Sequence, residues 1–489
     1  MSRIGEKVRR MIRNWLQIQP APQQTVSIQE RMTFETNVIK NKIWYRGDAD
    51  ELRDLYGQLQ GVGGRFWATV PTHGESVRKI HSGLPAMMVD VLASIVKADL
   101  SEPEFDGAGT EIWPEISDEI HFPDLVGEAV QETLVTGDGA FKISIDPDIS
   151  PYPLCEFYPA DRVKYDMQRG RVTGIRFYTH LYHKSTAYTL EEIYSRGRVE
   201  ARLFCGEQEV ALATLPELAQ YHDVIEFPGD FIMAAPFRIY SSSRYPGRGK
   251  SIFDTKTDDF DAHDETISQW MDAVRRGRVQ RYIPEDLLPR DKNGRFHRVS
   301  AFGADYIQIG GTTDDGKQQQ IQTVQPDINY EAYLSTYTAT LDMCLQGILS
   351  PATLGIDVGK MSSADAQREK KDITGHTRNA ITSALEKTLP DLISALLMAY
   401  DTMRNLSPGV YSPTVEFGEY GAPDFDSRVE VVNKAATAGT MSVEAQVDEL
   451  WGDSKDENWK KEEIARIKQM KGLIDALPPQ TGDELIDMG

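Results

Sequence analysis

The spacing of apolar residues changes along the first half of the chain, and each change predicts a different kind of structure. Between Ile43 and about Leu100, apolar residues recur at steps of three and four, which predicts helices. Another helix and then a strand are expected from Phe122 onwards. From Arg171 to Leu212, apolar and polar residues alternate between glycine-containing turns, as in an antiparallel meander. The first half is therefore predicted to be α+β.

The second half opens with two long helices that bracket a short insert. Bulky residues recur every seven positions from Phe253, and a second helical pattern follows Pro326. We predict that the two helices pack through Phe260, Ile267, Trp270, Leu334, Tyr337 and Leu341. The insert carries two turn signals, Asn293-Gly294 and Asp315-Gly316, each flanked by residues that favour strands. A small β-rich module with hairpins is therefore expected there.

A third long helix is predicted after Ser362 or Ser363, either of which would serve as its N-cap. Pro390 lies inside this pattern and should kink the helix, because proline removes a backbone donor and clashes with the preceding turn. Short helices are expected from Asp426, Ser442 and Glu457, followed by a polar tail.

Composition narrows the class of protein. A chain of 489 residues is too long for one core, and no apolar run approaches the roughly 20 residues that a membrane span needs. The net charge of −22 argues against a protein that grips nucleic acid over most of its surface. The three cysteines lie far apart, which favours neither a disulfide framework nor a zinc site, and a reducing cytoplasm is the expected place of folding.

The N-terminal segment, residues 1–18, is basic and carries apolar residues at helical spacing: Ile4, Val8, Met11, Ile12 and Trp15. It has no uninterrupted apolar stretch and no cleavage site, so it is not expected to be a signal peptide. Two interpretations stay open. The segment is either a helix on a membrane surface, or it docks on a partner or on the body of this protein.

The pair Gly359-Lys360 raises the possibility of a phosphate-binding loop. A Walker A loop needs a glycine where Leu354 stands and a serine or threonine where Met361 stands, and it follows a strand rather than a helix. A degenerate P-loop phosphotransferase using Lys360 is therefore kept only as an alternative. No catalytic or cofactor motif was found elsewhere, so neither an enzyme nor a cofactor is expected.

The local net charge changes from negative to positive where the first long helix ends and the insert begins. Ser251–Asp272 contains seven acidic residues and one lysine, whereas bases dominate from Arg275 to Arg298. The acids around His263 could hold a metal, but such clusters usually form a solvated helix face, and we predict no metal site. The bases are either ordinary surface charge, with Arg275 and Arg276 matching the helix dipole, or part of a docking surface.

The order of these elements resembles the portal proteins of tailed bacteriophages, of the siphophage type. The amino-acid sequence is also similar to that of these proteins in several stretches. Among them are "WYRGD", "KIHSGLPAMMVDVLASIV", "SIFDTKTDDFDAHDETISQWMDAVRRGR", "GILSPATLGID" and "SSADAQREKKDITGHTRNAI". The resemblance extends from about Ile43 to Lys471. It implies an α+β wing (31–250), a first stem helix (251–277), a clip (278–327), a second stem helix (328–348), a tunnel loop (349–362), a kinked helix with a wing strand (363–424) and crown helices (425–475). The predicted basic N-terminal helix (1–30) and polar tail (476–489) have no counterpart in the resemblance.

The resemblance also implies a function. Portal proteins form a ring of twelve subunits at a capsid vertex of the virion, through which terminase packages double-stranded DNA and through which the DNA later leaves. Head-tail connector proteins, capsid and scaffolding proteins are further partners, and assembly takes place in the host cytoplasm. The tunnel loop would comprise Leu354, Gly355, Ile356, Asp357, Val358, Gly359 and Lys360. Terminase or a connector would dock on the bases of the clip, Arg290, Lys292, Arg295 and Arg298. A peripheral membrane scaffold held by the N-terminal helix is the second alternative.

Overall fold

The computed structural model describes most of the chain between Met32 and Met470. The described residues are 32–59, 64–69, 77–107, 109–277, 280–284, 306–309, 322–324, 327–356, 364–418, 425–451 and 457–470. The predicted N-terminal helix (1–30) and the polar tail (476–489) lie outside these ranges.

Five helices form one side of a mixed α+β body. They are α2 (Phe34–Arg46), α3 (Ala49–Gln58), α4 (Leu84–Ala98), α5 (Trp113–Glu119) and α6 (Phe122–Thr136). Local sequence sets their ends. Thr33 caps α2 by accepting a hydrogen bond from the amide of Thr36 at 3.2 Å, and Gly47 ends it with a φ of 71°, which glycine adopts without strain.

Antiparallel sheets form the other side of the body. The smaller sheet has the order β10-β2-β3, from β10 (Ala234–Arg238), β2 (Asp138–Ser144) and β3 (Leu154–Pro159). The larger sheet has the order β4-β5-β6-β7-β8, with β9 paired to β7. Its strands are β4 (Val163–Gln168), β5 (Arg171–His183), β6 (Thr186–Ser195), β7 (Arg198–Cys205), β8 (Gln208–Val210) and β9 (Val224–Glu226). The predicted meander from Arg171 to Leu212 is confirmed by β5 to β8.

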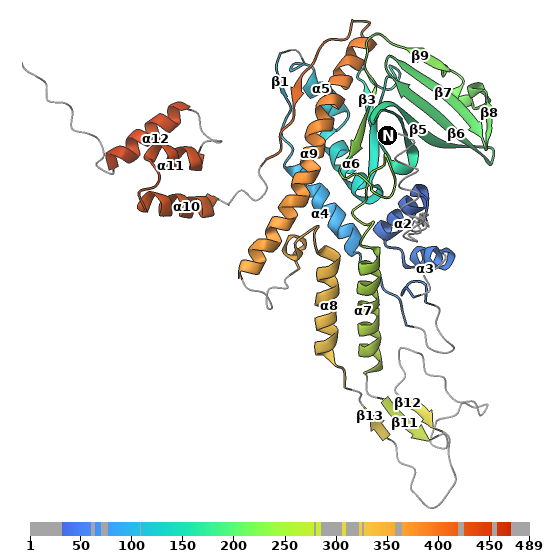
Figure 1. The fold of residues 1–489 in the computed structure, drawn as a ribbon, viewed down its shortest axis with the longest axis vertical. Coiled ribbons are helices and arrows are strands. Elements are labelled where there is room, and N and C mark those ends of the chain that lie inside the picture. The colour runs from blue at the N-terminus through green and yellow to red at the C-terminus, as the bar shows by residue number, and fades with distance from the viewer. Residues whose placement is uncertain are drawn as a thin grey trace, which may run out of the picture.

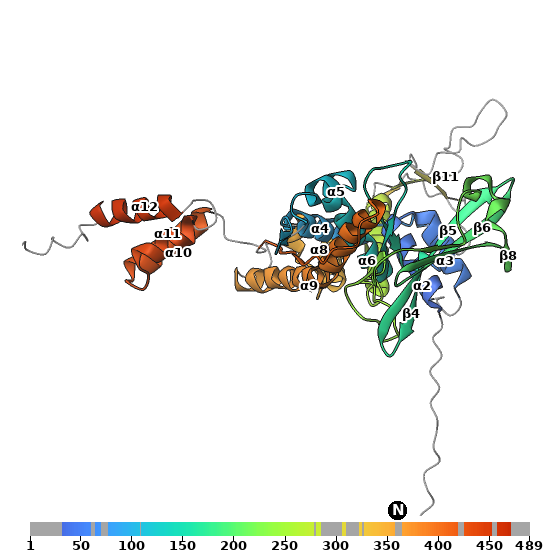
Figure 2. The ribbon, with the colours of Figure 1, turned by 90° about the horizontal axis from the view of Figure 1, so that it is seen from above.

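The long helix α9 (Ala364–Met403) packs along the body, and its apolar face belongs to the main core. Leu385, Leu389, Leu392 and Leu396 are all fully buried at steps of four and three residues, as a core-facing helix requires. In both views α6 lies between α9 and the six-stranded sheet (Figure 1 and Figure 2). A short two-stranded pair, β1 (Glu104–Phe105) with β14 (Pro413–Thr414), joins the segment after α9 to the body.

Two paired helices, α7 (Thr257–Arg276) and α8 (Tyr330–Leu345), extend from the body (Figure 1). The first was expected to begin near Phe253, but it begins at Thr257. The reason is that Asp254 anchors α2 instead: its Oδ1 accepts hydrogen bonds from the Nδ2 atoms of Asn37 and Asn41 at 2.8 and 3.0 Å.

The insert between these helices contains three described strands, β11 (Gln280–Pro284), β12 (Tyr306–Ile309) and β13 (Gln322–Val324). Strands are present in the described part of the insert, but β12 and β13 do not pair with each other as the hairpin expected at Asp315-Gly316 requires. The hairpin expected at Asn293-Gly294 lies outside the described residues. β12 and β13 flank the Asp315-Gly316 turn, yet each pairs with β11, β12 in parallel and β13 antiparallel. A two-residue turn dictates pairing only when strands adjoin it directly. Here twelve residues, 310–321, separate β12 from β13, which is enough chain to pass across β11.

The predicted C-terminal helices are present. They are α10 (Phe425–Thr437), α11 (Val443–Trp451) and α12 (Glu457–Met470), each beginning within one residue of the expected start. They pack on one another, with the rings of Trp451 and Trp459 5.6 Å apart. Pro390 lies inside α9, which continues to Met403, and the kink there stays a prediction.

Candidate functional site

Aromatic and polar side chains contact one another between the paired helices α7 and α8. Trp270 stacks on Tyr333 with ring centroids 6.2 Å apart and also meets Tyr337 edge-on at 6.1 Å. Two helical turns before Trp270 on α7, the Nδ1 of His263 lies 2.9 Å from the Oγ1 of Thr340. Stacked rings and a buried hydrogen bond fix the helices in one register.

The six residues predicted to pack between these helices have different surroundings. Phe260 is buried, but it packs on Trp44 of the body at 5.8 Å. Leu341 is buried, and the following are half-buried: Ile267, Trp270 and Tyr337. The side chain of Leu334 is 43% exposed, and its packing on α7 stays a prediction.

Large apolar side chains remain uncovered on the flanks of the helix pair. They are Met271, Val274, Tyr330, Leu334 and Met343. Met271 and Val274 lie one turn apart on α7, and Tyr330 and Leu334 lie one turn apart on α8. Each helix therefore exposes a pair of neighbouring apolar side chains.

Two acidic residues of α7 anchor the body rather than face solvent. The carboxylate of Asp261 accepts hydrogen bonds from the backbone N–H groups of Phe66 and Trp67 at 2.8 and 3.1 Å. Burial raises the pKa of Asp261, and the two backbone hydrogen bonds counter part of that rise. Asp264 is fully buried and accepts from the Trp67 indole at 3.2 Å and from the Ser82 amide at 2.9 Å.

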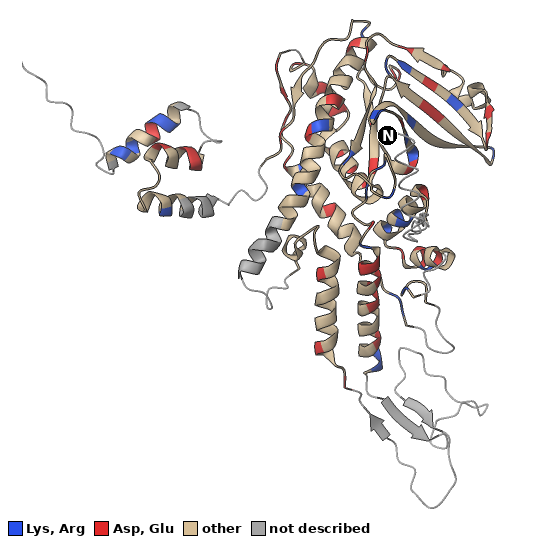
Figure 3. Ribbon diagram, in the orientation of Figure 1, with Lys and Arg blue, Asp and Glu red and all other residues tan. Residues whose placement is uncertain are grey.

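The prediction that this acidic cluster forms a solvated face is therefore wrong for Asp261 and Asp264, although the neighbouring Asp258 is exposed. Buried carboxylates need hydrogen-bond donors around them, and both aspartates have such donors here. Within the part of the chain that the structure describes, no group of histidine, cysteine, aspartate and glutamate side chains could hold a metal ion. Acidic residues nevertheless predominate along α7, with bases at its end (Figure 3).

His263 gives the helix pair a predicted dependence on pH. Burial lowers its pKa, and the opposing charge of Asp264 offsets this in part. Below the ordinary value of 6.5, the unfolded chain then binds more protons than the folded one, so stability falls as pH falls. One such group contributes a slope of at most about 1.4 kcal/mol per pH unit. We expect His263→Gln to flatten the fall of the urea midpoint between pH 6.5 and 5, whereas the exposed His376→Gln leaves the slope of the wild type.

The loop between α8 and α9 is fixed at its base by threonines of α9. Thr374 accepts a hydrogen bond from the Ser350 amide at 2.9 Å and lies 3.2 Å from the Thr353 hydroxyl. Thr377 donates to the carbonyl of Ile348 at 2.6 Å. These polar contacts hold the short helix η5 (Pro351–Leu354) against α9. Sequence reasoning missed both threonines, because hydroxyls inside a helix carry no local signal.

Of the predicted tunnel-loop residues, the structure describes three. Leu354 and Ile356 pack against the core, and Gly355 has a φ of 70°. The other four, Asp357, Val358, Gly359 and Lys360, lie outside the described residues, as do the bases Arg290, Lys292, Arg295 and Arg298. The elements before the loop are α8 and η5, whereas a phosphate-binding loop follows a strand, so the local context disfavours the P-loop alternative.

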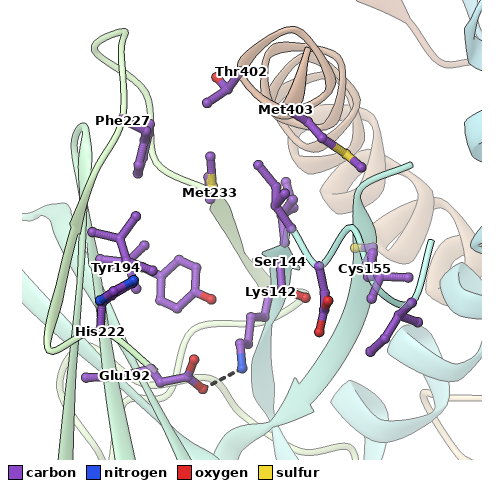
Figure 4. A pocket seen from close by; sticks show the side chains of 18 of the residues that line it. Lys142, Ser144, Cys155, Glu192, Tyr194, His222, Phe227, Met233, Thr402 and Met403 are labelled. Carbon is purple, nitrogen blue, oxygen red and sulfur yellow. Dashed lines mark hydrogen bonds and ion pairs between the residues drawn. The ribbon is translucent and has the colours of Figure 1, made fainter. Parts of the chain in front are cut away.

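A cavity of about 1060 Å³, here called the body cavity, opens between the two sheets and the end of α9. Lys142 of β2 and Glu192 of β6 form a buried ion pair at 2.5 Å on its wall (Figure 4). Burial opposes the charge of Lys142, but Glu192 and Tyr158 outweigh it and raise the pKa of the ammonium group. Sequence reasoning missed this cavity, whose lining residues also include Tyr194, Phe227, Met233 and Met403.

No helix among the described residues is long and apolar enough to cross a bilayer. No protein-family model matches the sequence, and no curated protein matches it either.

Solved structures similar to this chain come from gene transfer agent particles. One, from the virion of a native particle, is 10% identical over 78% of this chain and 89% of that chain, with a TM-score of 0.38. Another, from the neck of a native particle with C12 symmetry, is 12% identical over 75% and 89%, also at 0.38. A third, from the neck of an empty particle with C6 symmetry, is 12% identical over 81% and 96%, at 0.35. Because this similarity is distant, the functional argument rests on the residues of this chain.

Proposed function

We propose that this protein is the subunit of a phage-type portal ring, a conduit for double-stranded DNA at a capsid vertex of a virion. One observation carries the proposal: the helices α7 and α8 extend from an α+β body, bracket a small sheet and lead through a fixed loop base into the long α9. This order of elements is the one that the resemblance to siphophage portals implies. In those terms, α7 and α8 are the stem, β11 to β13 belong to the clip, and α10 to α12 form the crown.

The uncovered side chains on the helix pair support assembly into a ring. A patch that meets a different patch on the next copy makes a heterologous interface, and such an interface produces a ring when the rotation closes. Met271 and Val274 on α7, with Tyr330 and Leu334 on α8, provide apolar surface for two such contacts. The resemblance sets the proposed number of subunits at twelve.

Charge supports a channel through which DNA slides. Exposed acidic side chains just before and at the start of α8, Asp327 and Glu331, would repel a duplex rather than hold it. The proposed tunnel loop would place one cation per subunit, Lys360, near the phosphates. Because phosphate contacts carry no sequence information, the conduit would accept any DNA sequence.

The partners follow from this role. Terminase and later the head-tail connector proteins would dock on the clip, and capsid and scaffolding proteins would hold the body in the vertex. The ring would assemble in the host cytoplasm and remain in the virion. It would perform no catalysis of its own, because the packaging motor supplies the energy for DNA movement.

Assembly tests the proposal directly. We expect Leu334→Glu to prevent ring formation, because each interface would bury an unpaired carboxylate in an apolar contact, while the exposed position leaves the monomer folded. Negative-stain images of the wild type should show rings with a central hole, and the variant should sediment as a monomer with unchanged circular dichroism. Val410→Glu, the same type of change at a residue that is 93% exposed, is the matched control and should keep the rings. A wild-type protein that is a compact monomer would refute the proposed function.

A further inference from the structure

The mouth of the body cavity exposes apolar surface that no described part of the chain covers. Four of its lining residues have large side chains exposed to solvent: Ile149, Tyr221, Ile225 and Leu406. They come from three separate stretches of the chain, the loop after β2, the region around β9 and the end of α9. A contiguous apolar mouth over a cavity is typical of a binding groove rather than of an ordinary surface.

The rim of the same cavity is acidic. Glu119, Asp146, Glu156 and Glu226 line it, and none of the four forms an ion pair with another described residue. Besides His222, the lining includes one basic residue, Lys142, whose charge is already matched by Glu192. The cavity therefore presents an apolar floor with uncompensated negative charge around it, and its natural occupant combines an apolar face with positive flanks.

The N-terminal segment, residues 1–18, has this chemistry. Its apolar residues Ile4, Val8, Met11, Ile12 and Trp15 fall within one face of a helix, and its bases Arg3, Lys7, Arg9, Arg10 and Arg13 lie on the flanks and back. Its single acidic residue is Glu6. We propose that this segment docks as a helix in the body cavity of its own chain, with the apolar face on the floor and the bases against the acidic rim.

The connection is long enough for this docking. The described chain begins near Tyr245, whose hydroxyl donates to the carbonyl of Met32 at 3.0 Å. Residues 16–31 between the docked face and this point span up to about 50 Å when extended. A folded body of a few hundred residues has a radius of gyration of about 20 Å, so the connection reaches across it. The inference does not depend on the proposed function.

Protection of a thiol tests the docking in the full-length chain. Ile225→Cys places a reactive thiol at the cavity mouth, where the native side chain is 47% exposed. The native Cys205, the last residue of β7, serves as a reference in the same sample. We expect maleimide to label Cys at 225 at least about tenfold faster, relative to Cys205, when Val8→Asp and Ile12→Asp disrupt the apolar face of the segment. A tenfold increase in the labelling rate corresponds to a segment that is docked over the cavity mouth for about nine-tenths of the time.

A matched control variant and a dilution series complete the experiment. Ser2→Asp with Gln17→Asp adds the same charge on the polar side of the segment and should leave the labelling slow, as in the unmodified segment. Equal labelling rates in all three backgrounds would overturn the proposal. Protection within one chain is independent of protein concentration. Protection that disappears on dilution would assign the segment to a neighbouring copy and overturn docking within the chain.

Discussion

Replacing Asp264 by alanine is expected to lower the free energy of unfolding by about 3–5 kcal/mol, a large share of the stability of an ordinary domain. The carboxylate is fully buried and lies within hydrogen-bond distance of Trp67 Nε1, Ser82 N and His81 Nδ1, the last at 2.7 Å. Alanine would leave these groups without an acceptor in a site that water cannot enter. Urea denaturation followed by circular dichroism measures the change.

A neighbouring aspartate of the same helix provides the control. Asp258 forms a surface ion pair with Arg65, and its side chain is 64% exposed. Because exposed ion pairs contribute about 0–1 kcal/mol, Asp258→Ala should be close to neutral. Similar losses in both variants would mean that Asp264 acts through general helix electrostatics and not through its buried hydrogen bonds.

The elements that could be predicted from the sequence are those whose pattern is local. Heptad-like spacing predicted α7 and α8, because the side chains that a helix buries recur within a few residues of one another. The same locality explains why the meander of β5 to β8 was recognised, since each strand pairs with the next. The pairing of β2 with β10 joins segments about ninety residues apart, and no local pattern indicates it.

Contacts distant in sequence also decided the role of the acidic cluster. From the sequence, Asp258, Asp261 and Asp264 are equivalent acids near one end of a helix. Only the fold brings the backbone of residues 66 and 67 to Asp261, almost two hundred positions away. The body cavity was invisible for the same reason, because its lining comes from several separate stretches of the chain. In the insert, turn residues marked strands correctly but could not fix their partners across a long connection.

Reversing the charge of four bases in the insert is expected to abolish DNA-filled heads while rings still form. The change converts Arg290, Lys292, Arg295 and Arg298 to Glu. In the sequence these residues fall between β11 and β12, in the insert that connects α7 with α8. Under the proposed function this is where terminase docks, and complementary charge chiefly speeds and orients such an encounter. Counting filled and empty particles after packaging measures the effect.

The matched control changes the same number of charges on the body. Arg162, Lys164, Arg171 and Lys184 are exposed, and converting them to Glu also shifts the net charge by eight units from −22. If packaging fails only for the insert variant, the effect belongs to the position of the charge and not to its total. A pull-down with terminase then distinguishes terminase docking from DNA contact as the role of these bases. If terminase docks on them, the insert variant should no longer bind terminase. Retained binding with lost packaging would place the bases against the passing DNA, where four carboxylates per subunit in a confined channel repel phosphates with little screening.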